Sequence, residues 1–374
     1  NAPKITFRNI VRLLDCTFKL QLQFSEPLDL SLRLWLAYNL TLGSQIGNVT
    51  ARKELDGAVS QIIGVQERKS FKFIEEFIAA GDSGDEHILT PSRMHHAESA
   101  LGCIQCNYPV LLEGPPAVGK TALITDLARQ RGMRLERVNN TQTTSVQEYI
   151  GSYLPAGDGN FVFKKGALYR AMEDGSWFLA DEFNLAEPAV LNMLFPLLEG
   201  KRKIRVPGNN EVIVAHPDFR FFATQNDSSF ANRHELSHGL RNRFVEIQVE
   251  DFEPEELAEI LLKRKDTFPQ STVCIDDLSD VTKKLSGVYT SLKSNSIPIT
   301  TRELIRWMRR GKDLQDWALV GKMLLEPRQV QSSVSQLQSI LGNKQFDFDQ
   351  VCRVRVTQKN ENTITFEYGT ISIE

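Results

Sequence analysis

The motif GPPAVGKT at residues 114–121 restricts the possible folds of this chain more than any other feature. It matches the G-x-x-x-x-G-K-[ST] pattern of phosphate-binding loops, and it lies between the apolar run PVLLEG (109–114) and the amphipathic run KTALITDLARQRG (120–132). In a strand, loop and helix of this kind, the backbone N–H groups and the helix N-terminus face phosphate oxygens. The motif therefore predicts a nucleotide-binding loop in a domain with both strands and helices.

The residue types within this loop each have an expected task. Gly114 and Gly119 allow the backbone to curl around a phosphate. Lys120 supplies positive charge to the β- and γ-phosphates, and Thr121 offers its hydroxyl to Mg²⁺. We expect ATP and Mg²⁺ as cofactors, although a loop that contacts only phosphates does not distinguish ATP from GTP. The expected cofactor-binding residues are Asp181 together with Gly114, Pro115, Pro116, Ala117, Val118, Gly119, Lys120, Thr121 and Ala122.

Further strand-like runs follow the loop, and they are largely apolar rather than alternating. This pattern is typical of strands that are buried on both faces. With helical runs between them, they predict a parallel sheet between two layers of helices, which is a three-layer αβα fold. The runs are LERVNN (135–140), SWFLADE (176–182), FRFFATQN (219–226) and FVEIQV (244–249).

The patterns divide the chain into four expected parts. Residues 1–86 form a helical region or the tail of a preceding module, and residues 87–250 form the nucleotide-binding core. A helical lid follows at 251–344, and a β-hairpin extension at 345–374. Because the chain begins without methionine and stops within a strand-like run, we expect it to be a piece of a longer polypeptide.

Two strand-like runs end in polar residues that suit nucleotide hydrolysis. Asp181 and Glu182 are the last residues of a buried strand-like run. Burying a carboxylate costs free energy unless it binds a cation or a water. Asp181 is the candidate Mg²⁺ partner opposite Thr121, and Glu182 the candidate base that polarises an attacking water. Asn226 closes the next run and either holds that water or is a simple turn residue.

Several segments of the chain together resemble the AAA+ ATPases, and among them the midasin and dynein-related branch, which includes MoxR-like proteins. The resemblance is firm over about residues 88–250 and extends more weakly to about 312. It is carried by PVLLEGPPAVGKTAL, GALYRAMEDGSWFLADEFNLAEPAVLNMLFPLLEG, HPDFRFFATQND, LRNRFVEI and TTRELIRW.

The resemblance implies roles for individual residues. Lys120 and Thr121 fall in its Walker A motif, Asp181 and Glu182 in Walker B, and Asn226 at sensor 1. It also implies that Arg243 is an arginine finger for nucleotide bound by a neighbouring unit, with Arg241 as the second choice. Arg302 matches sensor 2. The catalytic set is therefore Glu182, Asn226, Arg243 and Arg302, and the Mg²⁺ ligands are Thr121 and Asp181.

The function implied is an ATP-hydrolysing motor module that remodels or removes proteins from a larger assembly. If the likeness to midasin extends to its role, the clients are ribosomal precursors. The alternatives are a MoxR-like chaperone ATPase or a restriction motor that uses GTP. An alternative of another class is a scaffold module that binds nucleotide without hydrolysing it.

The expected partners are neighbouring AAA+ modules in a hexameric or pseudo-hexameric ring, and a protein client reached through a von Willebrand A-type domain. A net charge of −3 and a pI near 6.2 give no reason to expect direct nucleic-acid binding. No run of 18 apolar residues is present, so we expect no membrane span. The expected location is intracellular, in the nucleus or nucleolus if the protein is midasin-like and in the cytoplasm otherwise.

Three other patterns have ordinary interpretations. His234 and His238 match the H-E-x-x-H zinc motif, but Gly239 follows directly and interrupts a helix, so we expect no zinc site. Cys103 and Cys106 form a C-x-x-C motif without a second pair, which favours packing over metal binding. Residues 156–168 and 203–219 are expected to contain β-hairpins that face a pore, a partner or solvent.

Overall fold

The structure is a computed structural model, and it falls into two compact units, residues 1–264 with 300–302 and residues 265–299 with 303–374. The described residues are 7–23, 29–65, 90–155, 160–206, 211–226, 236–263, 275–294, 299–310, 356–359, 363–366 and 369–372.

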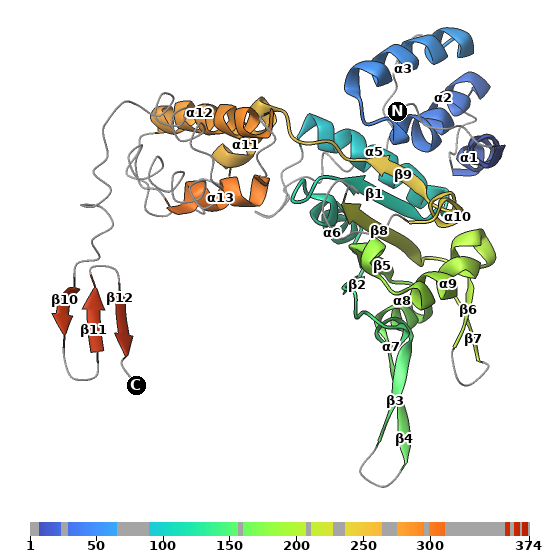
Figure 1. Cartoon of the computed structure of the whole chain (residues 1–374). Coiled ribbons are helices and arrows are strands. Elements are labelled where there is room, and N and C mark those ends of the chain that lie inside the picture. Colours follow the sequence, from blue (N-terminus) through green and yellow to red (C-terminus); the bar gives the residue numbers. More distant parts are fainter. Residues whose placement is uncertain are drawn as a thin grey trace. The chain divides into compact units, whose positions relative to one another are not determined.

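A five-stranded parallel sheet forms the centre of the first unit (Figure 1). Its strand order is β2-β5-β8-β1-β9, with bounds β1 Val110–Gly114, β2 Leu135–Asn139, β5 Trp177–Asp181, β8 Arg220–Asn226 and β9 Val245–Gln248. Every residue of β1 and β5 is buried, which explains their unbroken apolar runs. The prediction of a parallel α/β sheet is confirmed.

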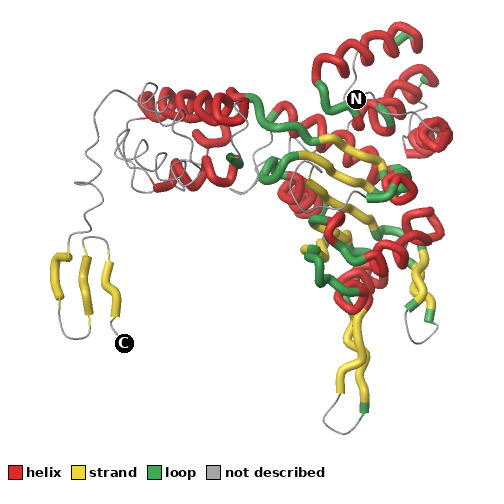
Figure 2. The backbone as a smooth tube through the Cα atoms, viewed as in Figure 1, coloured by secondary structure: helices red, strands yellow, loops and turns green. Residues whose placement is uncertain are grey.

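Helices cover both faces of this sheet (Figure 2). Because side chains alternate along a strand, Val110 and Leu112 belong to one buried cluster and Leu111 to the other. The first cluster includes residues of α5 and α6, and the second includes residues of α7, α8 and α9. The bounds are α5 Pro91–Gln105, α6 Lys120–Gln130, α7 Val146–Ile150, α8 Ala167–Asp174, η2 Phe183–Leu185, α9 Pro188–Pro196, η3 Leu197–Lys201, α10 His238–Arg241 and α11 Pro254–Lys263.

Three N-terminal helices pack on the first cluster: α1 Phe7–Gln23, α2 Leu30–Thr41 and α3 Val49–Ile63, with the short η1 Gly43–Gln45 after α2. Asp29 and Asn48 cap the starts of α2 and α3 through their side-chain oxygens. Leu40 is so close to Gly102 of α5 that a Cβ there would lie 2.3 Å from a Leu40 methyl group. These helices therefore share a core with the sheet. The expected boundary between the first two parts, at residues 86 and 87, lies outside the described residues.

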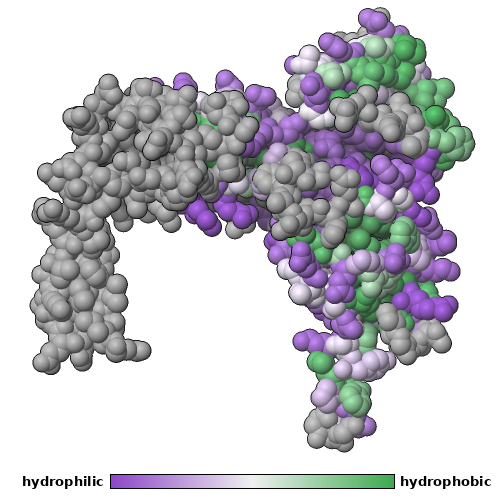
Figure 3. Space-filling view, in the orientation of Figure 1, coloured by the Kyte–Doolittle hydropathy of each residue, from purple (hydrophilic) through white to green (hydrophobic). Residues whose placement is uncertain are grey.

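Two antiparallel hairpins leave the sheet domain. The first pairs β3 Gly151–Pro155 with β4 Phe161–Lys165, and Figure 1 shows it projecting away from the sheet. The second pairs β6 Lys203–Arg205 with β7 Val212–Val214. Both expected hairpins are present, although the first begins before residue 156. Figure 3 shows apolar surface along the first hairpin, which exposes Tyr153, Leu154, Phe161 and Val162.

The second unit contains α12 Ile275–Ser294, most of α13 Thr301–Arg310, and a separate sheet. That sheet has three antiparallel strands, β10 Val356–Lys359, β11 Thr363–Phe366 and β12 Gly369–Ser372. The hairpin expected within residues 345–374 corresponds to β10 and β11, and the third strand, β12, was not predicted. No described helix is long and apolar enough to cross a membrane.

Candidate nucleotide-binding site

The loop between β1 and α6 has the backbone that its glycines predict. Gly119 adopts a left-handed conformation with φ 90° and ψ 14°, directly before the first residue of α6. Gly114 is needed for another reason, because a Cβ there would lie 2.0 Å from the carbonyl oxygen of Val249. The end of β1 and the residue after β9 are therefore in tight backbone contact.

Replacing Gly114 by alanine is expected to lower the free energy of unfolding by about 1–3 kcal/mol, because a backbone carbonyl must move to admit the methyl group. Urea denaturation measures the change. Gly57→Ala is the control, since nothing lies within 4 Å of the Cβ that it adds on α3. Equal stability of the Gly114→Ala variant and the wild type would contradict the close contact.

Lys120 lies inside the loop and is only 6% exposed. Its Nζ donates hydrogen bonds to the carbonyl oxygens of Gly114 at 2.7 Å and Pro115 at 2.6 Å, and to Oδ1 of Asn226 at 2.8 Å. The ammonium group therefore lies where β1 and β8 both end, next to the loop backbone.

Asp181 ends β5 close to the first turn of α6 and is 6% exposed. The hydroxyl of Thr121 donates to its two carboxylate oxygens at 2.9 and 3.0 Å. Thr224 of β8 and Arg137 of β2 also donate to this carboxylate. Hydroxyl and carboxylate oxygens are the ligands that Mg²⁺ prefers in proteins, so Thr121 and Asp181 fit a magnesium ion.

Glu182 and Asn226 meet at the same edge of the sheet. Glu182 has a left-handed backbone, with φ 50° and ψ 46°, and its N–H donates to the Thr224 hydroxyl at 3.2 Å. The Asn226 amide donates to Oε1 of Glu182 at 3.4 Å, while its oxygen accepts from Lys120. Asn226 therefore joins the lysine of the loop to the proposed base.

Arg241, the second-choice finger, is held within its own chain. Its guanidinium donates to the carboxylates of Glu113 on β1 and Glu246 on β9. Burial lowers the pKa of Arg241, but the hydrogen bonds that it donates to Glu246 and Glu113 outweigh burial, so its pKa is raised. This double ion pair joins two neighbouring strands and favours a structural role.

Arg243 lies elsewhere, and its partners differ. Its guanidinium pairs with Glu199 of η3, donates to the carbonyl oxygen of Gly239, and lies 4.3 Å from the ring centroid of Phe195. The structure thus brings together the five candidates of the loop and strand ends, while Arg243 lies apart from them. Arg302 is exposed at the second residue of α13, and its role remains a prediction.

Arg243 also lines a cavity of 640 Å³ between α1, η3 and the residues before β1. The cavity has an excess of positive charge. Its lining includes two acidic residues, Asp15 and Glu199, and, besides Arg243, the basic residues Arg8, Arg12, Lys19, Lys201 and Arg202. Arg12 donates to the backbone oxygens of Asn242, at 2.9 Å, and Phe244. Helix α1 therefore fixes the backbone on both sides of Arg243.

The zinc-like motif lies partly outside the described residues, whereas the C-x-x-C motif is packed in the core. Helix α10 starts at His238, and Ser237 before it is a non-helical N-cap, so no continuous helix reaches back to His234, which lies outside the described residues. Cys103 and Cys106 are buried, and the sulfur of Cys106 lies 3.5 Å from that of Cys16. The described residues include no cluster of three or more His, Cys, Asp or Glu side chains suited to a metal.

Comparison with known proteins agrees with this geometry. The model of the AAA domain of the dynein-related subfamily matches residues 109–244. The chain carries an AAA+ domain of the midasin and dynein-related branch. Midasin of Dictyostelium discoideum is 36% identical over 248 residues, which cover 65% of this chain and 4% of that protein. Midasin of Giardia intestinalis is 35% identical over 286 residues, 73% of this chain and 6% of that protein.

The chain thus spans a small fraction of the length of these midasins. An uncharacterized protein of Staphylococcus epidermidis is also similar, at 30% identity over 157 residues, which cover 41% of this chain and 59% of that protein. The matched AAA+ domain contains the phosphate loop, both carboxylates, Asn226 and Arg243. An AAA+ domain implies nucleotide binding.

Two residues of the AAA+ site were not anticipated from the sequence. Arg137 and Thr224 contact the Asp181 carboxylate from the two strands that flank β5. In the sequence they are ordinary strand residues without a motif. The strand order would have identified them, because both strands next to β5 place side chains beside Asp181 at the end of β5.

Proposed function

We propose that this chain is an ATP-hydrolysing AAA+ motor module. The observation that supports this proposal best is the convergence of five side chains at the carboxyl ends of β1, β5 and β8. Hydrogen bonds join Lys120 to Asn226 and Asn226 to Glu182, and another joins Thr121 to Asp181. These side chains supply the charge, the hydroxyl and the base that phosphoryl transfer to water needs.

In the proposed reaction, the loop backbone and Lys120 bind the β- and γ-phosphates. Thr121 and Asp181 would hold Mg²⁺, which supplies positive charge to the phosphate oxygens when it is bound. Glu182 orients a water for in-line attack on the γ-phosphate and takes its proton, and Asn226 keeps the Glu182 carboxylate in place. Arg302 is proposed as sensor 2 of this unit.

The proposed role of Arg243 requires a neighbour. A finger that acts on nucleotide bound by the next AAA+ module makes hydrolysis depend on ring assembly. The basic cavity around Arg243 supports this proposal, since a phosphate of a neighbour would meet an excess of positive charge there. The energy released would remodel a protein assembly, with ribosomal precursors as the client proposed from the likeness to midasin.

A binding and hydrolysis assay with the Lys120→Ala variant tests the proposal. The variant is expected to bind ATP roughly 10–100-fold more weakly, because charge-assisted hydrogen bonds to the phosphates are lost. Titration with a fluorescent ATP analogue and measurement of phosphate release give the two quantities, with GTP in parallel. Lys263→Ala is the control, because Lys263 forms an ion pair with Glu259 one turn earlier on α11 and is not one of the candidate site residues. Absence of ATP binding by the wild-type chain would overturn the proposal.

A further inference from the structure

Arg93, in the first turn of α5, is a fully buried cation that the proposed reaction does not use. Its side chain is 0% exposed, and burial lowers its pKa to about 10. A charge in such a place is costly unless polar groups surround it. Its contacts therefore indicate why an arginine stands here.

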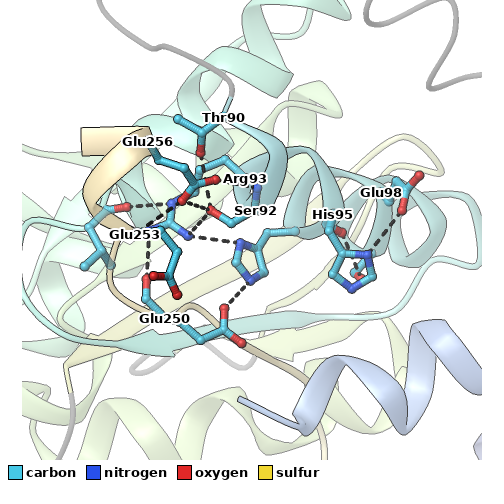
Figure 4. Close-up of polar contacts among 11 residues, drawn as sticks. Thr90, Ser92, Arg93, His95, Glu98, Glu250, Glu253 and Glu256 are labelled. Atoms are coloured by element: carbon cyan, nitrogen blue, oxygen red, sulfur yellow. Dashed lines mark hydrogen bonds and ion pairs between the residues drawn. The ribbon is translucent and has the colours of Figure 1, made fainter. Parts of the chain in front are cut away.

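The guanidinium of Arg93 joins two segments that are far apart in the sequence (Figure 4). Its Nε donates to the carbonyl oxygen of Val118, within the phosphate loop, at 3.1 Å. Its Nη2 donates to the carbonyl oxygen of Glu250, just after β9, at 2.7 Å, and the group lies 4.0 Å from the ring centroid of Phe252. The guanidinium is planar and rigid, so it fixes the separation of the two carbonyl groups.

A second layer of contacts holds Arg93 in this orientation. Its Nη1 lies 3.4 Å from Nδ1 of His96, and Nε2 of His96 lies 2.9 Å from the Glu250 carboxylate. Burial lowers the pKa of His96 more than Glu250 raises it, which favours the neutral ring, and in that form Nδ1 accepts from Arg93 while Nε2 donates to Glu250. Ser92 donates to Glu256 of α11 from its N–H at 2.8 Å and its hydroxyl at 2.9 Å. The first turn of α5 thus holds both the phosphate loop and the start of α11.

The bond to Val118 determines how the loop presents its backbone. In a trans peptide the C=O and the following N–H point in opposite directions. Because the Val118 carbonyl points to Arg93, the N–H of Gly119 points away from Arg93. Gly119 has no side chain to restrict its backbone, so this peptide could otherwise rotate and turn a carbonyl oxygen toward the phosphates.

We propose that Arg93 is a positioning residue that locks the Val118–Gly119 peptide with its N–H available to phosphate, and that couples the phosphate loop to the segment between β9 and α11. The proposal rests on the proposed function, because it assigns the loop to nucleotide phosphates. His96 and Glu250 support Arg93 and do not touch the loop in the contacts described above.

The test compares Arg93→Met and Arg93→Lys with a matched control. Arg220→Met is the control, because Arg220 also donates to backbone carbonyls, those of Ile104, Pro217 and Phe219, at the opposite end of β8. Arg93→Met is expected to weaken ATP binding about tenfold, the equivalent of one charge-assisted hydrogen bond, under conditions where the variant is folded. Arg93→Lys is expected to restore part of this affinity, and Arg220→Met to lose stability without losing affinity.

Hydrogen exchange, measured on the wild-type chain and on Arg93→Lys, tests the coupling directly. ATP is expected to slow hydrogen exchange of backbone amides in residues 250–256, and Arg93→Lys is expected to reduce this protection. Wild-type affinity in folded Arg93→Met, an equal loss in Arg220→Met, or unchanged exchange at 250–256 would overturn the role of Arg93. Failure of the wild-type chain to bind ATP would instead overturn the proposed function.

Discussion

Arg243→Ala is expected to lower the ATP hydrolysis rate of assembled chains by about 10³–10⁵-fold, the range found when an arginine finger is removed from a phosphoryl-transfer site. The physical reason is the loss of a fixed positive charge beside the γ-phosphate of a neighbour. In the single chain, Arg243 pairs with Glu199 and is not close to the phosphate loop of its own unit. The rate per chain is therefore expected to rise with chain concentration in the wild type and to stay flat in the variant.

Arg134→Ala is the matched control for this experiment. Arg134 is a largely exposed arginine that pairs with Glu136 on β2 and with Asp174 at the end of α8. Its replacement is expected to leave the concentration dependence intact. Equal rates in Arg243→Ala and the wild type at all concentrations would contradict the finger assignment. A rate near zero with ATP bound would show that two copies of this chain do not complete each other's sites.

Glu182→Gln is expected to lower the turnover number by about 10²–10⁴-fold, because the variant retains the shape of the side chain and loses its ability to accept a proton. The affinity for ATP is expected to stay within about threefold, since the phosphates are bound by the loop and Lys120. Single-turnover phosphate release measures the first quantity, and equilibrium titration with an ATP analogue the second.

Glu187→Gln is the control for Glu182→Gln. Glu187 precedes α9 on the same segment and makes no side-chain capping hydrogen bond to that helix. Its replacement is expected to leave both turnover and affinity unchanged. A Glu182→Gln variant that still turns over at the wild-type rate would remove Glu182 from the role of base, and one that cannot bind ATP would point to a structural role.

Short stretches of sequence were sufficient to predict the phosphate loop, the parallel sheet and the carboxylates at the end of β5. The reason is that these features depend on neighbours in the chain. A glycine-rich turn must follow a strand and precede a helix, and a strand buried on both faces must be apolar. The left-handed Gly119 and the fully buried β1 and β5 follow from these local requirements.

The tertiary structure alone showed which side chains contact one another in the site. The strand order β2-β5-β8-β1-β9 places Asn226 beside Lys120, although 106 residues separate them. Arg137, Thr224 and Arg93 belong to no recognised sequence motif, so only the fold identifies their hydrogen-bond partners. Long-range pairing depends on how strands and helices pack, and the same arginine can be solvated or buried depending on that packing.

The two arginines of RNRF illustrate the division between the two kinds of information. The sequence places Arg241 and Arg243 two residues apart, and the resemblance ranks Arg243 first and Arg241 second as the finger. The fold binds Arg241 to Glu113 and Glu246 on two adjacent strands, and it places Arg243 in the basic cavity. The sequence determined that this chain has an AAA+ phosphate loop and its carboxylates. The packing of strands and helices decided which groups each arginine contacts, because those groups belong to residues that are distant in the chain.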